Sequence, residues 1–251
     1  MGDVEQNGHN PVSVSITSAE LEKLSPKSIY FGHQSVGMNI IDGIVDIQSD
    51  LDVDLDFVES REIGSKNSFY HSHVGKNGDP ISKIQDFARL VDGGIGSDVD
   101  IAFFKLCYVD FKSNTDAEAV FQIYRQSMDR VEKEYPQVCF VHVTMPLSVR
   151  EKGLKTFVKG IIGRPRRGYG DNLKREKFNQ LMREYYGETG LIFDLARFES
   201  TFPDGSRLEF EQNGEKYYAL VPSYSSDGGH LNETGRRIIA NNLLHFLLSI
   251  E

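Results

Sequence analysis

Two short polar motifs near opposite ends of the chain hold the residue types of nucleophilic catalysis. The first, Gly32-His-Gln-Ser35-Val-Gly37, follows a short apolar run and precedes a helical pattern. A serine in this position has its backbone N–H near a helix N-terminus, where a developing oxyanion can be received. The alternative is that Ser35 is only a helix N-cap, a role that serine often fills.

The second motif is Asp227-Gly-Gly-His230, which directly precedes the last helical pattern. An aspartate three residues before a histidine on a glycine-rich turn lets one loop supply a general base and the carboxylate that fixes its tautomer. A serine nucleophile requires both groups. Taken alone, the motif also fits a polar turn whose histidine caps the following helix.

Lys105 lies inside the most apolar segment of the chain, residues 100–107. Burying an unpaired ammonium is costly. Either Lys105 sits at a strand end and extends its head to water, or it acts as an electrostatic clamp for an oxyanion or a substrate carboxylate, paired with Asp110.

Three histidines complete the set of candidate residues. His71 and His73 are spaced to share one face of a strand as two metal ligands, but no third ligand is evident, so no metal site is expected. His33, two residues before Ser35, is expected to line the pocket rather than act as the base. A structural ion network is expected from Asp194, Arg197 and Glu199.

The elements that must position these residues alternate between short apolar runs and longer amphipathic stretches. This alternation is typical of a parallel sheet covered by helices. Strands are predicted at 28–31, 51–58, 100–107, 138–145 and 191–195. Helices are predicted at 36–47, 81–91, 117–135, 172–186 and 234–249.

We expect an N-terminal extension over residues 1–25, one domain over 26–251, and two insertions within that domain. Residues 202–226 contain a hairpin-like pair of segments around a turn at 213–214. The stretch 150–169 carries seven Lys and Arg residues against one Glu. It is expected either to overhang the pocket and attract an anionic substrate, or to pair with the acidic body as a solvated loop.

Composition excludes several classes of protein. With 251 residues and a net charge of −9, the chain does not resemble a nucleic-acid-binding protein. No apolar run reaches the ~18–20 residues of a membrane span. Cys107 and Cys139 fit small buried hydrophobes better than a disulfide. Residues 1–10 lack a signal peptide, which favours the cytoplasm, or the periplasm or secretion if a leader has been removed. The oligomeric state stays open.

Together, Ser35 after the first strand and Asp227 with His230 before the last helix resemble the SGNH/GDSL hydrolase family. The resemblance implies a three-layer α/β/α, flavodoxin-like sandwich, here with a central, mainly parallel, five-stranded sheet. It implies Ser35 as nucleophile, His230 as general base and Asp227 as the residue that orients it, with no cofactor.

The family's second block offers a glycine N–H to the oxyanion, and Gly78 in Asn77-Gly78-Asp79-Pro80 matches that place. Two departures mark a divergent branch. The first block reads GHQS instead of GDS, and the third, Cys107-Tyr-Val109-Asp110, lacks the family's asparagine. The substitutes for that donor are Asn77, Lys105 and Tyr108.

The sequence therefore predicts a serine esterase or deacylase that acts through an acyl-enzyme. An O-acyl group, such as acetyl, on a carbohydrate is the expected substrate. An acyltransferase of the same fold and a non-catalytic carbohydrate-binding relative are the alternatives.

Overall fold

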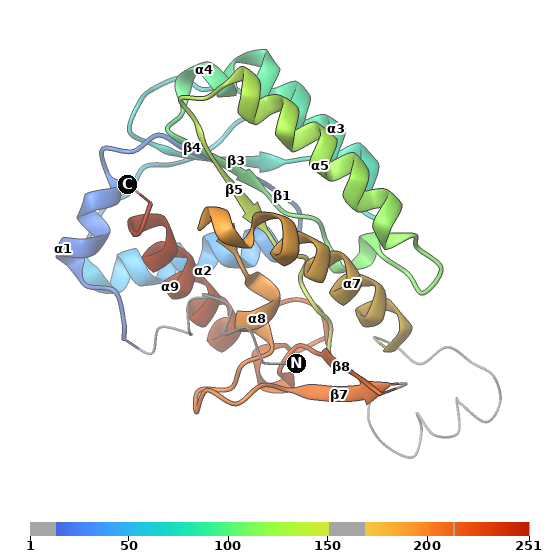
Figure 1. Ribbon diagram of the computed structural model, residues 1–251. Coiled ribbons are helices and arrows are strands. Elements are labelled where there is room, and N and C mark those ends of the chain that lie inside the picture. Colours follow the sequence, from blue (N-terminus) through green and yellow to red (C-terminus); the bar gives the residue numbers. More distant parts are fainter. Residues whose placement is uncertain (1–13, 151–168, 213, 251) are drawn as a thin grey trace.

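The computed structural model describes residues 14–150, 169–212 and 214–250 (Figure 1). Its centre is a six-stranded parallel sheet with the strand order β2-β3-β1-β4-β5-β6. The strands are β1 (Ile29–His33), β2 (Phe57–Glu59), β3 (Phe69–His73), β4 (Ile101–Phe104), β5 (Cys139–Val143) and β6 (Ile192–Phe193).

Helices cover both faces of this sheet, because alternate side chains of each buried strand point to opposite layers. Phe31 and Phe103 pack in the core formed with α2 (Val36–Leu51), α8 (Leu195–Glu199) and α9 (Glu233–Leu248). Their neighbours Tyr30 and Phe104 pack in a second core with the helices of the other layer. Those helices are α3 (Pro80–Leu90), α5 (Ala117–Glu134) and α7 (Tyr169–Tyr186). The predicted three-layer α/β/α architecture is confirmed (Figure 1).

The sheet differs from the prediction on one side. The sixth strand is β3, which was not predicted, and the strand expected at 51–58 shrinks to β2. Helix α2 continues to Leu51 and ends where Asp52 adopts the left-handed conformation (φ 53°). The alternation at 51–58 therefore reflects a helix end and the loop that follows it, not a full strand.

The expected N-terminal extension and the hairpin region both contain ordered elements. Ile16, Leu21 and Leu24 are buried in the α2–α9 core, and α1 (Ser18–Leu21) carries one of them. Strands β7 (Glu209–Gln212) and β8 (Glu215–Tyr218) pair antiparallel, as predicted for the hairpin. Cys107 and Cys139 are free thiols.

Most of the basic insertion, residues 151–168, lies outside the described residues. A short helix, α4 (Gly96–Asp98), links α3 to β4 through a π-helical turn. No helix in the described ranges is long and apolar enough to cross a membrane.

Candidate active site

Ser35 occupies the turn between β1 and α2, at the carboxyl edge of the sheet. Its backbone (φ 10°, ψ −79°) is neither helical nor extended, and its side chain makes no capping hydrogen bond to α2. Gly37 N–H donates to Gln34 O (2.7 Å) and Asn39 N–H to Ser35 O (3.2 Å), which closes the turn. The hydroxyl is therefore not used as an N-cap and remains accessible to chemistry.

Asp227 and His230 form a pair within the loop that precedes α9. One carboxylate oxygen of Asp227 accepts the N–H groups of Gly229 (2.9 Å) and His230 (2.8 Å), and the other lies 2.6 Å from His230 Nδ1. These bonds, led by the one to the imidazole, hold the pKa of Asp227 well below its ordinary value. An ionised carboxylate at Nδ1 fixes the proton there, so Nε2 is the nitrogen that can accept a proton.

One hydrogen bond connects this loop to the first turn of α2. Leu231 N–H donates to Asn39 Oδ1 (3.1 Å), although the two residues are 192 positions apart in the sequence. Ser35 and His230 therefore lie at the same edge of the sheet. Among the described hydrogen bonds none joins their side chains, a common state in structures without substrate.

The loop after β3 is attached to the residue that precedes Ser35. Gln34 Nε2 donates to Val74 O and to Gly75 O (both 3.1 Å), so the residue just before the serine holds this loop in place. Sequence reasoning gave Gln34 no role, because an amide that binds backbone oxygens carries no recognisable motif.

The backbone N–H of Gly78 already has a hydrogen-bond acceptor within the protein. The group donates to Asp110 Oδ1 at 2.8 Å, so this geometry does not support the expected oxyanion donor. Asp110 also accepts Cys107 N–H at 2.6 Å. Its carboxylate ties the Gly78 loop to the end of β4.

Lys83 completes this arrangement and was not predicted. Its Nζ lies 2.8 Å from both oxygens of Asp110, and both side chains are fully buried. The same Nζ donates to Asn77 Oδ1 (3.0 Å), which directs the Asn77 amide nitrogen away from Lys83. The expected pairing of Asp110 with Lys105 is wrong, since Lys83 occupies that position.

Lys105 is also fully buried, so its head does not reach water as one interpretation required. Its Nζ makes two long contacts with described residues, to Leu106 O and Cys107 Sγ, both at 3.5 Å. Burial raises the pKa of Glu199 to about 8 against the opposing effects of the Leu147 N–H and of Lys105. Lys105 and Glu199 therefore belong to the interior of the domain.

His33 is buried beside Lys105 and two further histidines. Its Nε2 lies 3.0 Å from His71 Nδ1, and the ring of His73 meets it edge-on. Burial, and then the charge of Lys105, lower the pKa of His33 to about 2. An imidazole with so low a pKa is a weak proton acceptor, which disfavours His33 as the general base. Within the described ranges no group of three His, Cys, Asp or Glu side chains is arranged to hold a metal ion.

Tyr108 packs against the His230 loop. Its ring lies edge-on to the imidazole, with centroids 5.6 Å apart, and a Cβ on Gly229 would come within 2.5 Å of it. A side chain at 229 would therefore displace the Tyr108 ring. Val149 N–H donates to Gly228 O (2.9 Å) and supports the loop from a second side.

Arg175, on α7, joins these two supports. Its buried guanidinium donates to Tyr108 O and to Ser148 Oγ, each at 2.8 Å, and also contacts Asn172 Oδ1. Asn172 in turn accepts Ser148 N–H (3.1 Å) and donates to Ser148 O (2.8 Å). No sequence signal identifies Arg175, because Tyr108 and Ser148, which it holds, are 67 and 27 residues away along the chain.

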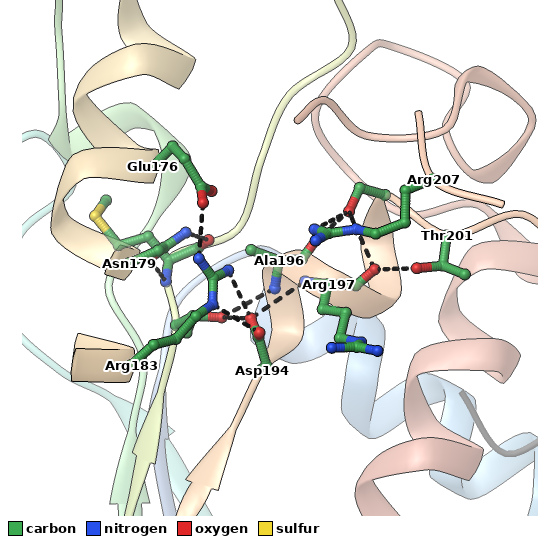
Figure 2. Close-up of polar contacts among 11 residues, drawn as sticks. Glu176, Asn179, Arg183, Asp194, Ala196, Arg197, Thr201 and Arg207 are labelled. Atoms are coloured by element: carbon green, nitrogen blue, oxygen red, sulfur yellow. Dashed lines mark hydrogen bonds and ion pairs between the residues drawn. The ribbon is translucent and has the colours of Figure 1, made fainter. Parts of the chain in front are cut away.

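An ion network near α8 contains Asp194, as expected, but joins it to Arg183 and Glu176 (Figure 2). Arg183 lies between Asp194 (2.7 Å) and Glu176 (2.7 Å), and Asp194 caps α8 by accepting Arg197 N–H. Glu199 instead accepts Leu147 N–H at 2.6 Å. The network fastens α7 to the end of β6.

No protein-family model and no curated protein sequence matches the chain. Among solved structures, a Streptococcus pneumonia protein provisionally named a platelet activating factor is similar, with 15% identity and a TM-score of 0.51. The match covers 92% of this chain and 90% of that one. At this identity the likeness shows the fold alone.

Two further solved structures show weaker similarity. One is a member of the lipolytic protein G-D-S-L family from Veillonella parvula, with 14% identity, a TM-score of 0.47 and coverage of 88% and 98%. The other is the periplasmic domain of a lipopolysaccharide acetyltransferase from Salmonella ser. Paratyphi A, with 12% identity, a TM-score of 0.46 and coverage of 94% and 90%.

Proposed function

We propose that this protein is a serine esterase or deacylase that uses Ser35, His230 and Asp227. The observation that carries the proposal is the Asp227–His230 pair, set on a loop that is hydrogen-bonded to α2 one turn after Ser35. A binding module has no need for a carboxylate that fixes the tautomer of an exposed imidazole beside a serine.

In the proposed reaction, Ser35 Oγ attacks the ester carbonyl carbon while His230 Nε2 takes the hydroxyl proton. Asp227 stabilises the imidazolium that forms. The C–O bond to the alcohol then breaks, and His230 returns the proton to the leaving oxygen. His230 Nε2 then takes a proton from water while the water oxygen attacks the acyl carbon. The bond between that carbon and Ser35 Oγ breaks, and His230 returns the proton to Ser35 Oγ, which releases the acid and restores the serine.

For the oxyanion we propose the Ser35 N–H and the Asn77 side-chain amide as donors. Asn77 is exposed, and Lys83 orients it so that its NH₂ group faces away from the buried ion pair. Removal of one such donor from an oxyanion hole typically slows a reaction by about 10²–10³-fold.

We propose an O-acyl group, such as acetyl, on a carbohydrate as the substrate. The His230 and Asp227 side chains are 42% and 55% exposed, so a group as bulky as a saccharide can approach them from solvent. An acyltransferase would use the same residues and would replace water with a hydroxyl of the acceptor.

A fluorophosphonate probe tests the proposal, because it reacts with an activated serine hydroxyl. We expect the wild-type protein to be labelled and to hydrolyse acetylated sugars, and Ser35→Ala to lose both properties. Ser49→Ala, which removes an exposed hydroxyl from the same helix, is the matched control and should keep both.

Two negative results of this experiment would have different meanings. Labelling that persists in Ser35→Ala would exclude this serine as the nucleophile. A wild-type protein that is neither labelled nor active would favour the non-catalytic carbohydrate-binding alternative.

A further inference from the structure

A pocket lies on the α2–α9 layer, at the end of α2 that is distant from Ser35. Its volume is about 900 Å³, and it is enclosed by α8, the loop after α8, the last turn of α2 and the middle of α9. Ser35 precedes the first turn of α2, whereas Ile47 and Leu51 at the other end of that helix line the pocket. Measured along α2 at 1.5 Å per residue, Ile47 and Leu51 lie roughly 18 Å and 24 Å from Ser35.

The walls of this pocket combine apolar surface with arginine. Ile16, Phe198 and Ile238 contribute to the apolar part. Every cationic residue among its described lining residues is an arginine, namely Arg197, Arg207 and Arg237. Guanidinium groups bind carboxylates and phosphates in a planar, two-pronged manner that lysine does not provide.

The two acidic residues of the lining are already engaged. Asp50 forms an ion pair with Arg237. Asp204 accepts the N–H (2.9 Å) and the hydroxyl (2.6 Å) of Ser206 within its own turn. The Asp50 pair also neutralises Arg237, so the described lining, with three arginines against two aspartates, carries a net charge of +1 in a chain whose net charge is −9.

The positions of two of these arginines favour the binding of an anion. Arg207 lies over the Tyr218 ring (3.3 Å) and donates to Ser200 Oγ (2.8 Å), so its guanidinium is held in a fixed position. The side chain of Arg197 extends from α8 away from Asp194 (Figure 2).

We infer that this pocket is a second binding site, for a small organic anion with an apolar body. Its volume lies within the ~300–1,000 Å³ range of small-molecule sites, which are mostly apolar with a few orienting polar groups. The head group is a carboxylate or a phosphate, and the apolar part packs against α2 and α9. The inference stands apart from the proposed esterase activity.

Calorimetric titration with four eight-carbon probes tests this site: octanoate, octyl phosphate, 1-octanol and octyltrimethylammonium. We expect both anions to bind with one site per chain, the alcohol to bind at least tenfold more weakly, and the cation not to bind. The tighter of the two anions identifies the head group. Equal binding of the alcohol and the anions, or no binding of either anion, would overturn the inference.

Variants locate the site. Arg197→Gln should weaken anion binding about tenfold, and Ile238→Trp should block it by filling the pocket. Arg89→Gln, which removes a largely exposed arginine from α3 on the opposite layer, is the matched control and should bind normally. Thermal unfolding of each variant checks that it is folded.

Ser35→Ala separates this inference from the proposed function. The variant should bind the anions as tightly as the wild type. Loss of binding in Ser35→Ala would place the anion at the candidate active site, and an unchanged Kd in both Arg197→Gln and Ile238→Trp would exclude the pocket.

Discussion

The two sides of the candidate active site are held by different physical means. On the side of the Gly78 loop, the Lys83–Asp110 pair is fully buried, and its carboxylate also binds two backbone N–H groups. On the other side, Asp227 and His230 are 55% and 42% exposed and depend on hydrogen bonds within their own turn. A buried pair is costly to break, whereas an exposed pair contributes little to stability. The first side thus fixes the fold, and the second is suited to chemistry.

The exposed pair should have the largest effect on activity. Under the proposed function, Asp227→Asn should lower kcat/KM for an acetyl ester by about 10⁴-fold, because the imidazole loses the carboxylate that fixes its tautomer. His230→Ala should cost at least as much. Both variants should unfold within about 1 kcal/mol of the wild type in urea. A loss below tenfold in both would remove this loop from the catalytic machinery.

The buried pair should have a much larger effect on stability than the exposed pair. Lys83→Met leaves Asp110 buried without its countercharge, so the free energy of unfolding should fall by about 3–5 kcal/mol. Arg130→Ala is the control: it breaks the exposed pair with Asp92, whose side chains are 45% and 40% exposed, and should cost at most about 1 kcal/mol. Urea denaturation measures both. Equal losses would show that burial does not distinguish the two sides.

Arg175 joins the two supports of the His230 loop and sharpens the comparison. Arg175→Lys keeps the charge but loses the fork that holds Tyr108 O and Ser148 Oγ, so the His230 loop should lose its support. We expect kcat to fall about thirtyfold with KM nearly unchanged, since a displacement near 1 Å can cost ~10²-fold. An effect on melting temperature alone, with kcat unaltered, would assign Arg175 a structural role only.

The interior charges predict a dependence of stability on pH. Burial raises the pKa of Glu199 to about 8 from 4.5. Between about pH 5 and 7.5, the unfolded chain has released this proton and the folded chain keeps it, so stability falls as pH rises, by up to about 1.4 kcal/mol per unit. Glu199→Gln should remove that slope. Parallel wild-type and variant curves of unfolding free energy against pH would contradict the assignment.

The sequence predicted the layers of the fold better than its polar interior. Four predicted strands and the long helices were found because continuous apolar runs and helical periodicity survive in the sequence. Strand β3 was missed because three of its five residues are polar. Buried partners satisfy two of the three, Ser72 through Tyr30 (2.7 Å) and His71 through His33 (3.0 Å).

The candidate site was predictable where motifs are local and not where partners are distant. Asp227 and His230 are three residues apart, so their pairing follows from the turn. Asp110 meets Lys83 across 27 residues, and nothing in the spacing distinguishes Lys83 from Lys105 as its partner. Which lysine reaches the carboxylate is decided by the packing of α3 against the sheet.

The bonds between Ser148 and Asn172 join the segment after β5 to the first turn of α7. Because these points already touch, the chain that connects them pays little further entropy when its length changes. Segments of different length and composition can therefore be exchanged at this junction while the sheet, Ser35 and the His230 loop stay as they are. This makes the region a natural place for relatives of one scaffold to diverge in specificity.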